Sequence, residues 1–305
     1  MGMDLSVVVC TYNRVCYLKL AIESLLNQSI GKENFEIIVV DNGSTDGTKA
    51  LIDKYYDRCI KYLYESKQGL SFARNTGWKA ATGEWVAYID DDAVASPHWV
   101  ENIIEFIKMQ NNQAAVVGGP AYLVWPVEKP AWLNGKLLEF LSFVDHGLSS
   151  CQLEPGQDLY GVNCVFRKKY LEQAGGFDAE LGRVGCNLLS GEETVLISEI
   201  TKLGGEVFYV ANALVWHHVS PERTSRKWFL RRCYWQGVTG ARIELADKNF
   251  LSSIKHLCLS FLSALKLIFK LSFNVLRLES FKDMCSLASK FGRIVELTRL
   301  MLYAC

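Results

Sequence analysis

The sequence predicts an α/β fold built on a mostly parallel, doubly wound β-sheet sandwiched by helices, with a helical appendage at the C-terminus. Short β-branched apolar runs alternate with segments of helical periodicity, and the connections between them are short. Each of several apolar runs ends in a cluster of polar residues. With 305 residues, half of them hydrophobic, we expect a main domain over residues 1–225 and a smaller region over residues 226–305.

The first elements follow this alternation. Residues 5–10 (LSVVVC) are typical of a strand buried on both faces. Leu18, Ile22 and Leu25 then fall at helical spacing. Residues 36–40 (EIIVV) predict the second strand, so the segment forms one strand–helix–strand unit.

The next elements continue the pattern. Residues 60–64 predict a third strand, residues 71–81 a helix, and residues 85–89 (WVAYI) a fourth strand. Ser96 and Pro97 are suited to be the N-cap and first residue of the following helix.

Three polar clusters begin where predicted strands end, at residues 11–14, 41–46 and 90–92. Ligands of parallel α/β sheets bind beyond the carboxyl ends of the strands. We therefore expect the three clusters to converge on one edge of the sheet.

The triplet Asp90-Asp91-Asp92 is the most acidic of these clusters. Desolvated carboxylates are costly unless they are paired or bind a cation, and Mg²⁺ and Mn²⁺ prefer carboxylate and phosphate oxygens. The triplet thus favours a metal–diphosphate site, with a solvated turn as the alternative. Asp41 could accept a hydrogen bond from a nucleobase or close an Asx turn. Arg74 could bind phosphate or brace the acidic triplet, with an ordinary surface arginine as the alternative.

Four motifs in order resemble the family-2 inverting glycosyltransferases of the GT-A fold. They are Ser6-Val-Val-Val-Cys-Thr-Tyr-Asn-Arg14, Val39-Val-Asp-Asn-Gly-Ser-Thr-Asp46, Ala73-Arg-Asn-Thr-Gly77 and Tyr88-Ile-Asp-Asp-Asp-Ala93. The resemblance spans roughly residues 4–225. It implies a nucleoside-diphosphate-sugar donor and Mn²⁺ or Mg²⁺ as cofactor, with Asp92 as a metal ligand. It implies that Thr11, Tyr12 and Arg14 line the nucleotide pocket, that Asp41 contacts the base and that Asp90 lies near the ribose and metal. We also expect Arg74 and Asp91 in the nucleotide-sugar pocket.

The second half adds candidates for the catalytic base. Glu192 and Glu193 stand where many members of the family carry Gly-Glu-Asp, so this chain has Glu at the Asp position. An inverting displacement needs one carboxylate to take the proton of the acceptor hydroxyl. We favour Glu193 and keep Glu192 as the alternative base. A helix N-terminus enriched in acidic residues is the structural alternative.

His217 and His218 follow apolar residues at the end of another predicted strand. The resemblance implies that a histidine here completes the metal shell. We favour His218, with His217 as the alternative.

Charge divides the chain unevenly. Residues 1–225 carry 19 Lys and Arg against 28 Asp and Glu, a net of −9, whereas residues 226–305 carry 14 against 5, a net of +9. The apolar and basic residues 257–278 are typical of amphipathic helices at a membrane interface, with an ordinary pair of packed helices as the alternative. A peripheral membrane contact is favoured over nucleic acid, which we do not expect as a partner.

The ten cysteines show no CxxC pair and several lie in apolar runs, which favours a reducing, cytoplasmic location. The sequence as given starts without a signal-peptide pattern, and it has no stretch of about 20 uncharged apolar residues. We therefore expect a cytoplasmic protein on the cytoplasmic face of a membrane.

Together these observations predict an inverting glycosyltransferase that uses a UDP-sugar in preference to other donors. The expected acceptor is a hydroxyl of a polysaccharide, a lipid-linked glycan or another glycan precursor. The alternatives are a metal-dependent nucleotidyltransferase and a catalytically inactive nucleotide-sugar-binding protein.

Overall fold

The computed structural model describes residues 4–55, 60–110, 114–154, 156–185, 187–246, 259–266, 268 and 279–303. The chain forms two compact units. Unit 1 comprises Met1–Pro126, Leu138–Glu180 and Glu192–Val219, and unit 2 comprises Val127–Leu137, Leu181–Gly191 and Ser220–Cys305. The domain boundary that the sequence predicts at residue 225 stays a prediction. Unit 2 also includes two shorter segments from earlier in the chain.

Unit 1 is built on an eight-stranded sheet in the order β3-β2-β1-β4-β9-β6-β10-β8. Strands β1 to β4 are mutually parallel, as are β6 and β10, while β9 and β8 run antiparallel to their neighbours. The bounds are β1 (Leu5–Thr11), β2 (Phe35–Asp41), β3 (Ile60–Tyr64), β4 (Trp85–Ile89), β6 (Ala114–Gly118), β8 (Cys151–Gln152), β9 (Asn163–Arg167) and β10 (Glu206–Tyr209). The predicted α/β class with a mostly parallel sheet is confirmed.

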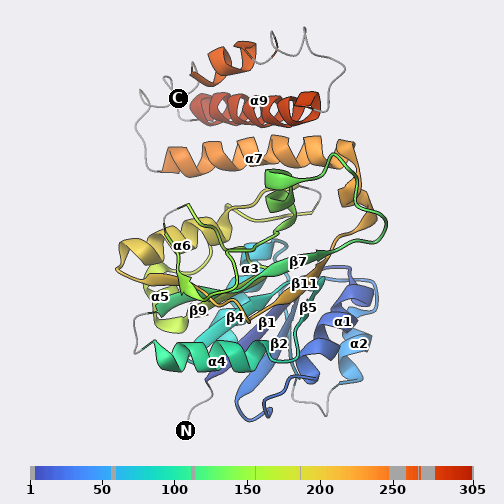
Figure 1. The fold of residues 1–305 in the computed structure, drawn as a ribbon, viewed down its shortest axis with the longest axis vertical. Coiled ribbons are helices and arrows are strands. Elements are labelled where there is room, and N and C mark those ends of the chain that lie inside the picture. Colours follow the sequence, from blue (N-terminus) through green and yellow to red (C-terminus); the bar gives the residue numbers. More distant parts are fainter. Residues whose placement is uncertain are drawn as a thin grey trace. The chain divides into compact units, whose positions relative to one another are not determined.

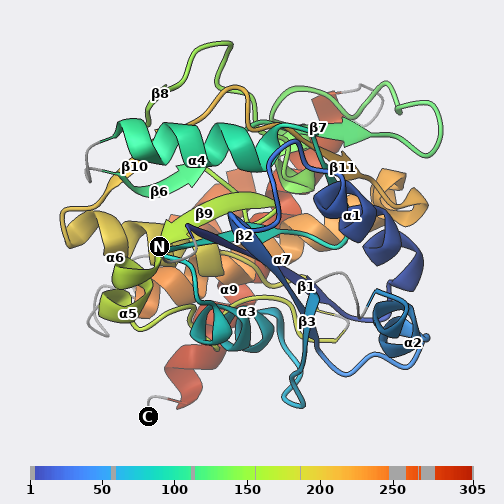
Figure 2. The ribbon, with the colours of Figure 1, turned by 90° about the horizontal axis from the view of Figure 1, so that it is seen from below.

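The apolar runs of the sequence form the centre of this sheet. Every residue of β4 is buried, and so are five of the first six residues in β1 and the last five of β2. Helices then cover both faces, and Figure 2 shows α4 on one side of the sheet and α3 on the other. The helices of unit 1 are α1 (Val15–Leu26), α2 (Thr48–Asp53), α3 (Leu70–Ala80), α4 (Trp99–Met109), α5 (Lys168–Ala174) and α6 (Glu192–Lys202).

The start of α4 differs from the prediction. The N-cap is His98, and Ser96 lies one turn earlier, where its carbonyl accepts the backbone N–H of Trp99. The Ser96-Pro97 pair therefore forms the turn that leads into the helix, because residues 93–95 continue the chain as a strand, β5 (Ala93–Ala95), directly after the acidic triplet.

A second, three-stranded sheet of unit 1 has the order β5-β11-β7. Its other strands are β7 (Ala121–Val124) and β11 (Val215–His218), and a 3-10 helix, η2, covers Gly135–Leu141. Strand β11 pairs antiparallel with β5, with His217 opposite Ala93. This pairing brings the two histidines next to the acidic triplet.

Unit 2 contains the 3-10 helix η3 (Pro221–Thr224) and two long helices, α7 (Arg226–Ala246) and α9 (Glu279–Tyr303). Helices α7 and α9 pack against each other, as Figure 1 shows. The expected helical C-terminal region is thus present, although residues 257–258, 267 and 269–278 of its amphipathic stretch lie outside the described residues. In the described part of the chain, no helix combines the length and the apolar character needed to cross a membrane.

Candidate active site

The carboxyl ends of β1 and β4 are joined by side-chain contacts. The Thr11 hydroxyl donates to Asp91 Oδ2 over 2.8 Å. Arg14 Nη1 donates to Asp91 Oδ1 at 2.9 Å and to Asp92 Oδ2 at 2.7 Å. The first and third polar clusters therefore meet, because adjacent parallel strands β1 and β4 end at the same edge.

The second cluster joins the first through hydrogen bonds from backbone N–H groups to side-chain oxygens. The backbone N–H of Asn13 donates to Ser44 Oγ at 2.9 Å, and that of Thr45 donates to Asn13 Oδ1 at 2.7 Å. Asn13 has a φ of 54°, a left-handed conformation that asparagine tolerates better than most residues. The two loops thus form one layer at the sheet edge.

Asp41 is buried at the end of β2 and its carboxylate is held from two sides. Oδ1 accepts the backbone N–H of Ser44 at 2.8 Å, and Oδ2 accepts the Tyr62 hydroxyl at 2.9 Å. Burial and the neighbouring Asp41 carboxylate raise the pKa of Tyr62, so the phenol stays protonated and donates. Asp41 therefore closes the loop, as the turn alternative predicted, and it keeps lone pairs for another donor.

Arg14 is the cation of the acidic triplet. Burial opposes its charged form, but the carboxylates of Asp92 and Asp91 outweigh this effect and raise the pKa of Arg14. Burial raises the pKa of Asp91, although Arg14 and the Thr11 hydroxyl oppose that rise. The positive charge of Arg14 thus partly neutralises the negative charge of the three adjacent carboxylates.

Arg74 connects the acidic triplet to the glutamate pair. Its side chain, on α3, is almost fully buried, and Nη1 lies 2.7 Å from Glu192 Oε1 and 3.6 Å from Glu193 Oε2. Nη2 lies 3.6 Å from Asp90 Oδ1. The guanidinium also lies 5.3 Å from the ring centroid of Phe177. Carboxylates from β4 and α6, about a hundred residues apart in the chain, therefore share one buried cation.

The two glutamates differ in ionisation. Burial raises the pKa of Glu192, and the adjacent Glu193 carboxylate adds to this rise. Burial also disfavours charge on Glu193, but Arg74 and backbone N–H donors outweigh it, so the pKa of Glu193 is lowered. The Oε2 atoms of both residues are buried and have no hydrogen-bond partner within the described part of the chain. When Glu192 holds a proton, its carboxyl can donate to the adjacent Glu193 carboxylate.

Gly161 provides the space for this arrangement. Its backbone N–H donates to Glu193 Oε1 at 2.9 Å. A Cβ at this position would lie 2.0 Å from Arg74 Nη2 and 3.0 Å from Glu193 Oε1. Only glycine lets the backbone approach both groups.

His217 and His218 occupy opposite faces of β11, because successive strand residues alternate. His217 is buried, and its Nε2 lies 3.2 Å from Asp92 Oδ1. Its Nδ1 lies 2.9 Å from the carbonyl oxygen of Leu141, which can only accept, so Nδ1 carries the proton. His218 is half-buried and its ring lies near Tyr17, 6.3 Å between centroids. The structure therefore places His217, which sequence analysis ranked second, against Asp92.

The family-level comparison covers most of these elements. The model of glycosyl transferase family 2 matches residues 6–175, more than half of the chain. The match includes the three polar clusters and Arg74 and stops before Glu192. The chain belongs to glycosyl transferase family 2. Its activity class is therefore glycosyl transfer, which is evidence against the nucleotidyltransferase alternative.

Individual proteins extend this likeness beyond the family match. Over 258 residues the chain is 30% identical to the glucosyl-dolichyl phosphate glucuronosyltransferase of Haloferax volcanii, covering 81% of each sequence. Its fold resembles the mannosyltransferase PcManGT of Pyrobaculum calidifontis in complex with GDP-Man and Mn²⁺, with TM-score 0.62, 16% identity and coverage of 99% of this chain and 87% of that one. It also resembles TarS 1-349 of S. aureus in complex with UDP, with TM-score 0.57, 17% identity and coverage of 98% and 92%. The predicted GT-A fold is confirmed.

The donor set of this glycosyltransferase can be tested for its fit to a divalent cation. Within the described residues, no group of three or more His, Cys, Asp and Glu side chains is arranged to hold a metal. His217 Nε2 nevertheless lies 3.2 Å from Asp92 Oδ1, while its Nδ1 lies against the Leu141 carbonyl oxygen. Mg²⁺ is commonly bound by one or two carboxylates together with substrate phosphates. The two side chains fit a cation whose remaining ligands come from a diphosphate.

Most of the predicted pocket residues of the glycosyltransferase are brought together, with one exception. Tyr12 is 40% exposed, and its side chain takes no part in the network described above. Sequence analysis missed Tyr62, Gly161 and Asn75, whose side-chain amide bonds both the N–H and the carbonyl of Phe177. The register of β3 beside β2 could have indicated Tyr62, but the role of Gly161 depends on contacts far apart in the chain.

Proposed function

We propose that this family 2 glycosyltransferase is an inverting, metal-dependent enzyme that transfers a sugar from a UDP-sugar to a hydroxyl of a lipid-linked or polysaccharide acceptor. Glu193 is the general base, and Glu192 is its protonated partner. Thr11, Tyr12, Arg14 and Asp41 lie on the nucleotide side. Asp90 and Asp91 belong to the same side, and Asp92 with His217 forms the cation site.

One observation carries this proposal. Arg74 lies within 3.6 Å of both Asp90, at the end of β4, and Glu193, at the start of α6. A sugar bound between Asp90, on the nucleotide side, and the proposed base Glu193 would therefore have both groups close to it. Such proximity is what in-line attack on the anomeric carbon requires.

The ionisation of the pair supports Glu193 as the base. A general base must be deprotonated and must reach the substrate. Arg74 and the Gly161 N–H keep Glu193 ionised, and its side chain is 13% exposed compared with 3% for Glu192. Burial raises the pKa of Glu192, so its carboxyl favours the neutral form, which can donate to the base and orient it.

The cation site supports metal dependence. A bound Mn²⁺ or Mg²⁺ would neutralise charge that develops on the departing nucleoside diphosphate. Asp92 and His217 would hold it from the protein side. Arg14 orients Asp92 through the 2.7 Å contact, and the Leu141 carbonyl sets the tautomer of His217.

The relatives support the substrate classes. The H. volcanii protein is named for a dolichyl phosphate-linked glucosyl acceptor, which supports a lipid-linked acceptor here. The TarS complex with UDP supports uridine, while the PcManGT complex with GDP-Man makes GDP the competing donor. A cytoplasmic location remains a prediction, consistent with free Cys10, Cys16, Cys151, Cys164, Cys233 and Cys285.

The test is a matched pair of substitutions at the glutamates. Glu193→Gln removes the base, and we expect a loss of roughly 10²–10⁴-fold in kcat. Glu192→Gln replaces a neutral carboxyl with a neutral amide that can still donate to Glu193, so its loss should be at least tenfold smaller. Sugar transfer or donor hydrolysis is measured at saturating donor for both variants.

Calorimetric binding of UDP with Mn²⁺ provides the control, because neither substitution touches the nucleotide side. Equal losses in both variants would contradict the assignment of roles. Tight UDP binding by the parent without any transfer or hydrolysis would instead favour the inactive nucleotide-sugar-binding alternative.

A further inference from the structure

The helical segment of residues 259–266 in unit 2 has an unusual orientation. Its contact with α9 uses small residues: Lys290 Nζ donates to Ser263 Oγ at 2.6 Å, and Ala264 is buried. Its large apolar residues face outward and, with Ile268, are 48–56% exposed; they are Leu259, Phe261, Leu262, Leu265 and Ile268. Helices of a globular protein ordinarily bury their large apolar residues. This segment instead exposes them and buries small ones.

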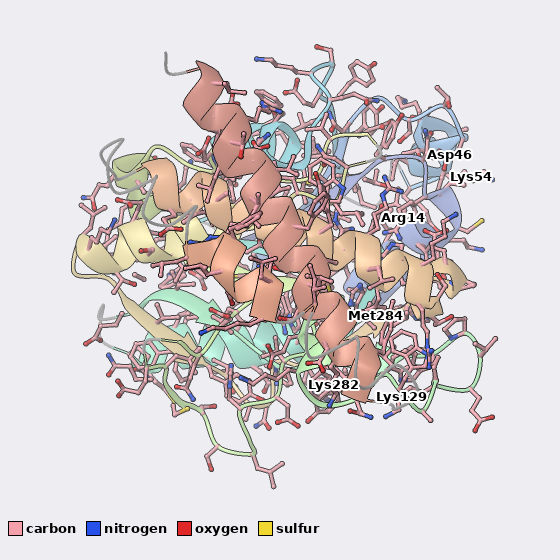
Figure 3. All side chains as sticks on the ribbon, turned by 90° about the horizontal axis from the view of Figure 1, so that it is seen from above. Arg14, Asp46, Lys54, Lys129, Lys282 and Met284 are labelled. Carbon is pink, nitrogen blue, oxygen red and sulfur yellow. The ribbon has the colours of Figure 1, made fainter. Side chains whose placement is uncertain are left out.

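Helix α9 carries a second exposed apolar stripe. Met284, Phe291, Val295 and Leu302 are 38–74% exposed. They are separated by seven, four and seven residues, so they lie within about 20° of one line on a helix with roughly 100° per residue. Figure 3 shows Met284 and Lys282 near the start of α9. Other positions of α9 are buried, including Phe281, Cys285 and Leu297.

Two outward apolar faces in one small unit are unfavourable in water. Soluble monomers rarely expose contiguous apolar patches of large side chains, and those that do usually use them for binding. We call these two sets the apolar faces of unit 2: the first is Leu259, Phe261, Leu262, Leu265 and Ile268, and the second is Met284, Phe291, Val295 and Leu302.

Charge identifies the occupant. Residues 226–305 carry 14 Lys and Arg against 5 Asp and Glu. Lys266 and Lys282 are exposed on the same helices as the apolar faces. A second copy of the chain would bring like charge against like charge, whereas an anionic lipid surface is complementary to both features. Because none of the described helices can span a bilayer, such contact would be interfacial.

We propose that the apolar faces of unit 2 insert into the interface of an anionic lipid bilayer, with exposed basic residues of the same helices, such as Lys266, on the headgroups. Only the purpose of this lipid contact rests on the proposed function: the contact would hold the enzyme where a lipid-linked acceptor lies. The contact itself depends on unit 2 alone.

The experiment measures co-sedimentation of the full chain with vesicles of equal parts phosphatidylcholine and phosphatidylglycerol, and with phosphatidylcholine alone. The parent should bind the anionic vesicles, and this binding should weaken at high salt. It should bind the neutral vesicles at least tenfold more weakly. The double variant Phe261→Ser/Leu265→Ser should bind at least tenfold more weakly than the parent. Leu203→Ser, at a residue of unit 1 that is 51% exposed, is the matched control and should bind like the parent.

Unchanged vesicle binding by the double variant would overturn the proposal, as would no binding by the parent. A parent dimer that the double variant converts to monomer, without vesicle binding by either, would assign the faces to a second copy and also overturn it. Transfer to a water-soluble acceptor, donor hydrolysis and UDP binding are measured in parallel and should not change in the double variant. If the parent lacks transfer but binds vesicles, the proposed function fails while the lipid contact stands.

Discussion

Arg74 is a buried cation that faces three carboxylates from two distant parts of the chain. Desolvation of the guanidinium is compensated by Glu193, Glu192 and Asp90, and the net effect is to raise the pKa of Arg74. The same attraction lowers the pKa of Glu193. A single buried residue thus lowers the pKa of the proposed base through its charge.

Substitution of Arg74 should therefore change the pH dependence of the reaction. Glu193 acts as a base only when ionised, so activity falls as the pH drops below its pKa. Arg74→Met removes the charge that lowers this pKa, and the ascending limb of kcat/KM against pH should move to higher pH. Arg74→Lys keeps a positive charge and should leave the limb closer to that of the parent.

Arg74→Met also leaves buried carboxylates without a cation, which costs on the order of 3–5 kcal/mol in the free energy of unfolding. Urea unfolding of both variants identifies any loss of fold. A folded Arg74→Met variant with the parent's pH profile would show that Arg74 does not tune Glu193.

The two histidines allow a discriminating metal experiment. His217 faces Asp92 across 3.2 Å, whereas His218 lies on the other face of β11 near Tyr17. His217→Ala should weaken apparent Mn²⁺ affinity in the presence of UDP by roughly tenfold or more. His218→Ala should retain most of it. Thermal unfolding against Mn²⁺ concentration gives both values, and a greater loss in His218→Ala would reassign the ligand.

At the scale of elements, local sequence pattern predicted some features and not others. Strands β1, β2 and β4 are β-branched or aromatic apolar runs followed by polar clusters, so their position and ends were predictable. The antiparallel direction of β9 and the pairing of β5 with β11 were not. Strand β5 has three residues, too few for periodicity to identify, and strand direction depends on partners far along the chain.

The crossing of α7 and α9 gives a prediction at this scale. A Cβ on Gly237 would lie 1.8 Å from the backbone carbonyl oxygen of Ser289, whereas a Cβ on Gly240 would meet nothing closer than 4.0 Å. Gly237→Ala must separate the helices and should destabilise unit 2 by about 1–3 kcal/mol. Gly240→Ala, in the same helix, should be neutral or stabilise it by up to about 1 kcal/mol because alanine favours the helix.

Far-UV circular dichroism during urea unfolding compares these two variants. If Gly237→Ala unfolds at the same urea concentration as Gly240→Ala, the close crossing of α7 and α9 is wrong. A loss of stability in both variants would indicate that the glycines are needed in α7 for a reason other than close packing against α9.

For the whole molecule, ligand binding should be visible as stability. A ligand that binds only the folded protein adds about 2.7 kcal/mol at 100 times its Kd. Because Asp92 and His217 provide too few ligands on their own, we expect UDP and Mn²⁺ to stabilise together more than the sum of each alone. Thermal unfolding with UDP, GDP, dTDP and CMP, each with and without Mn²⁺, tests this. The largest shift with GDP would replace the proposed uridine donor, and shifts independent of Mn²⁺ would contradict the cation site.

The charge of the whole chain also divides by region. A net of zero conceals −9 over residues 1–225 and +9 over residues 226–305. The acidic part contains the carboxylates of the site, and the basic part contains the apolar faces of unit 2. The two parts therefore differ in the proposed anionic partner, which is a cation-bridged diphosphate for the acidic part and a lipid surface for the basic part.

The sequence by itself determined the fold class, the glycosyltransferase family and the polar clusters at the strand ends, because these depend on residue type and spacing along a short stretch of chain. The tertiary structure alone decided which histidine faces Asp92, which glutamate has its pKa lowered by Arg74 and which face of residues 259–266 is exposed. Each of these depends on burial and on contacts between residues distant in the chain, such as Arg74 with Glu192. Desolvation and electrostatic pairing act through space, so no local pattern records them.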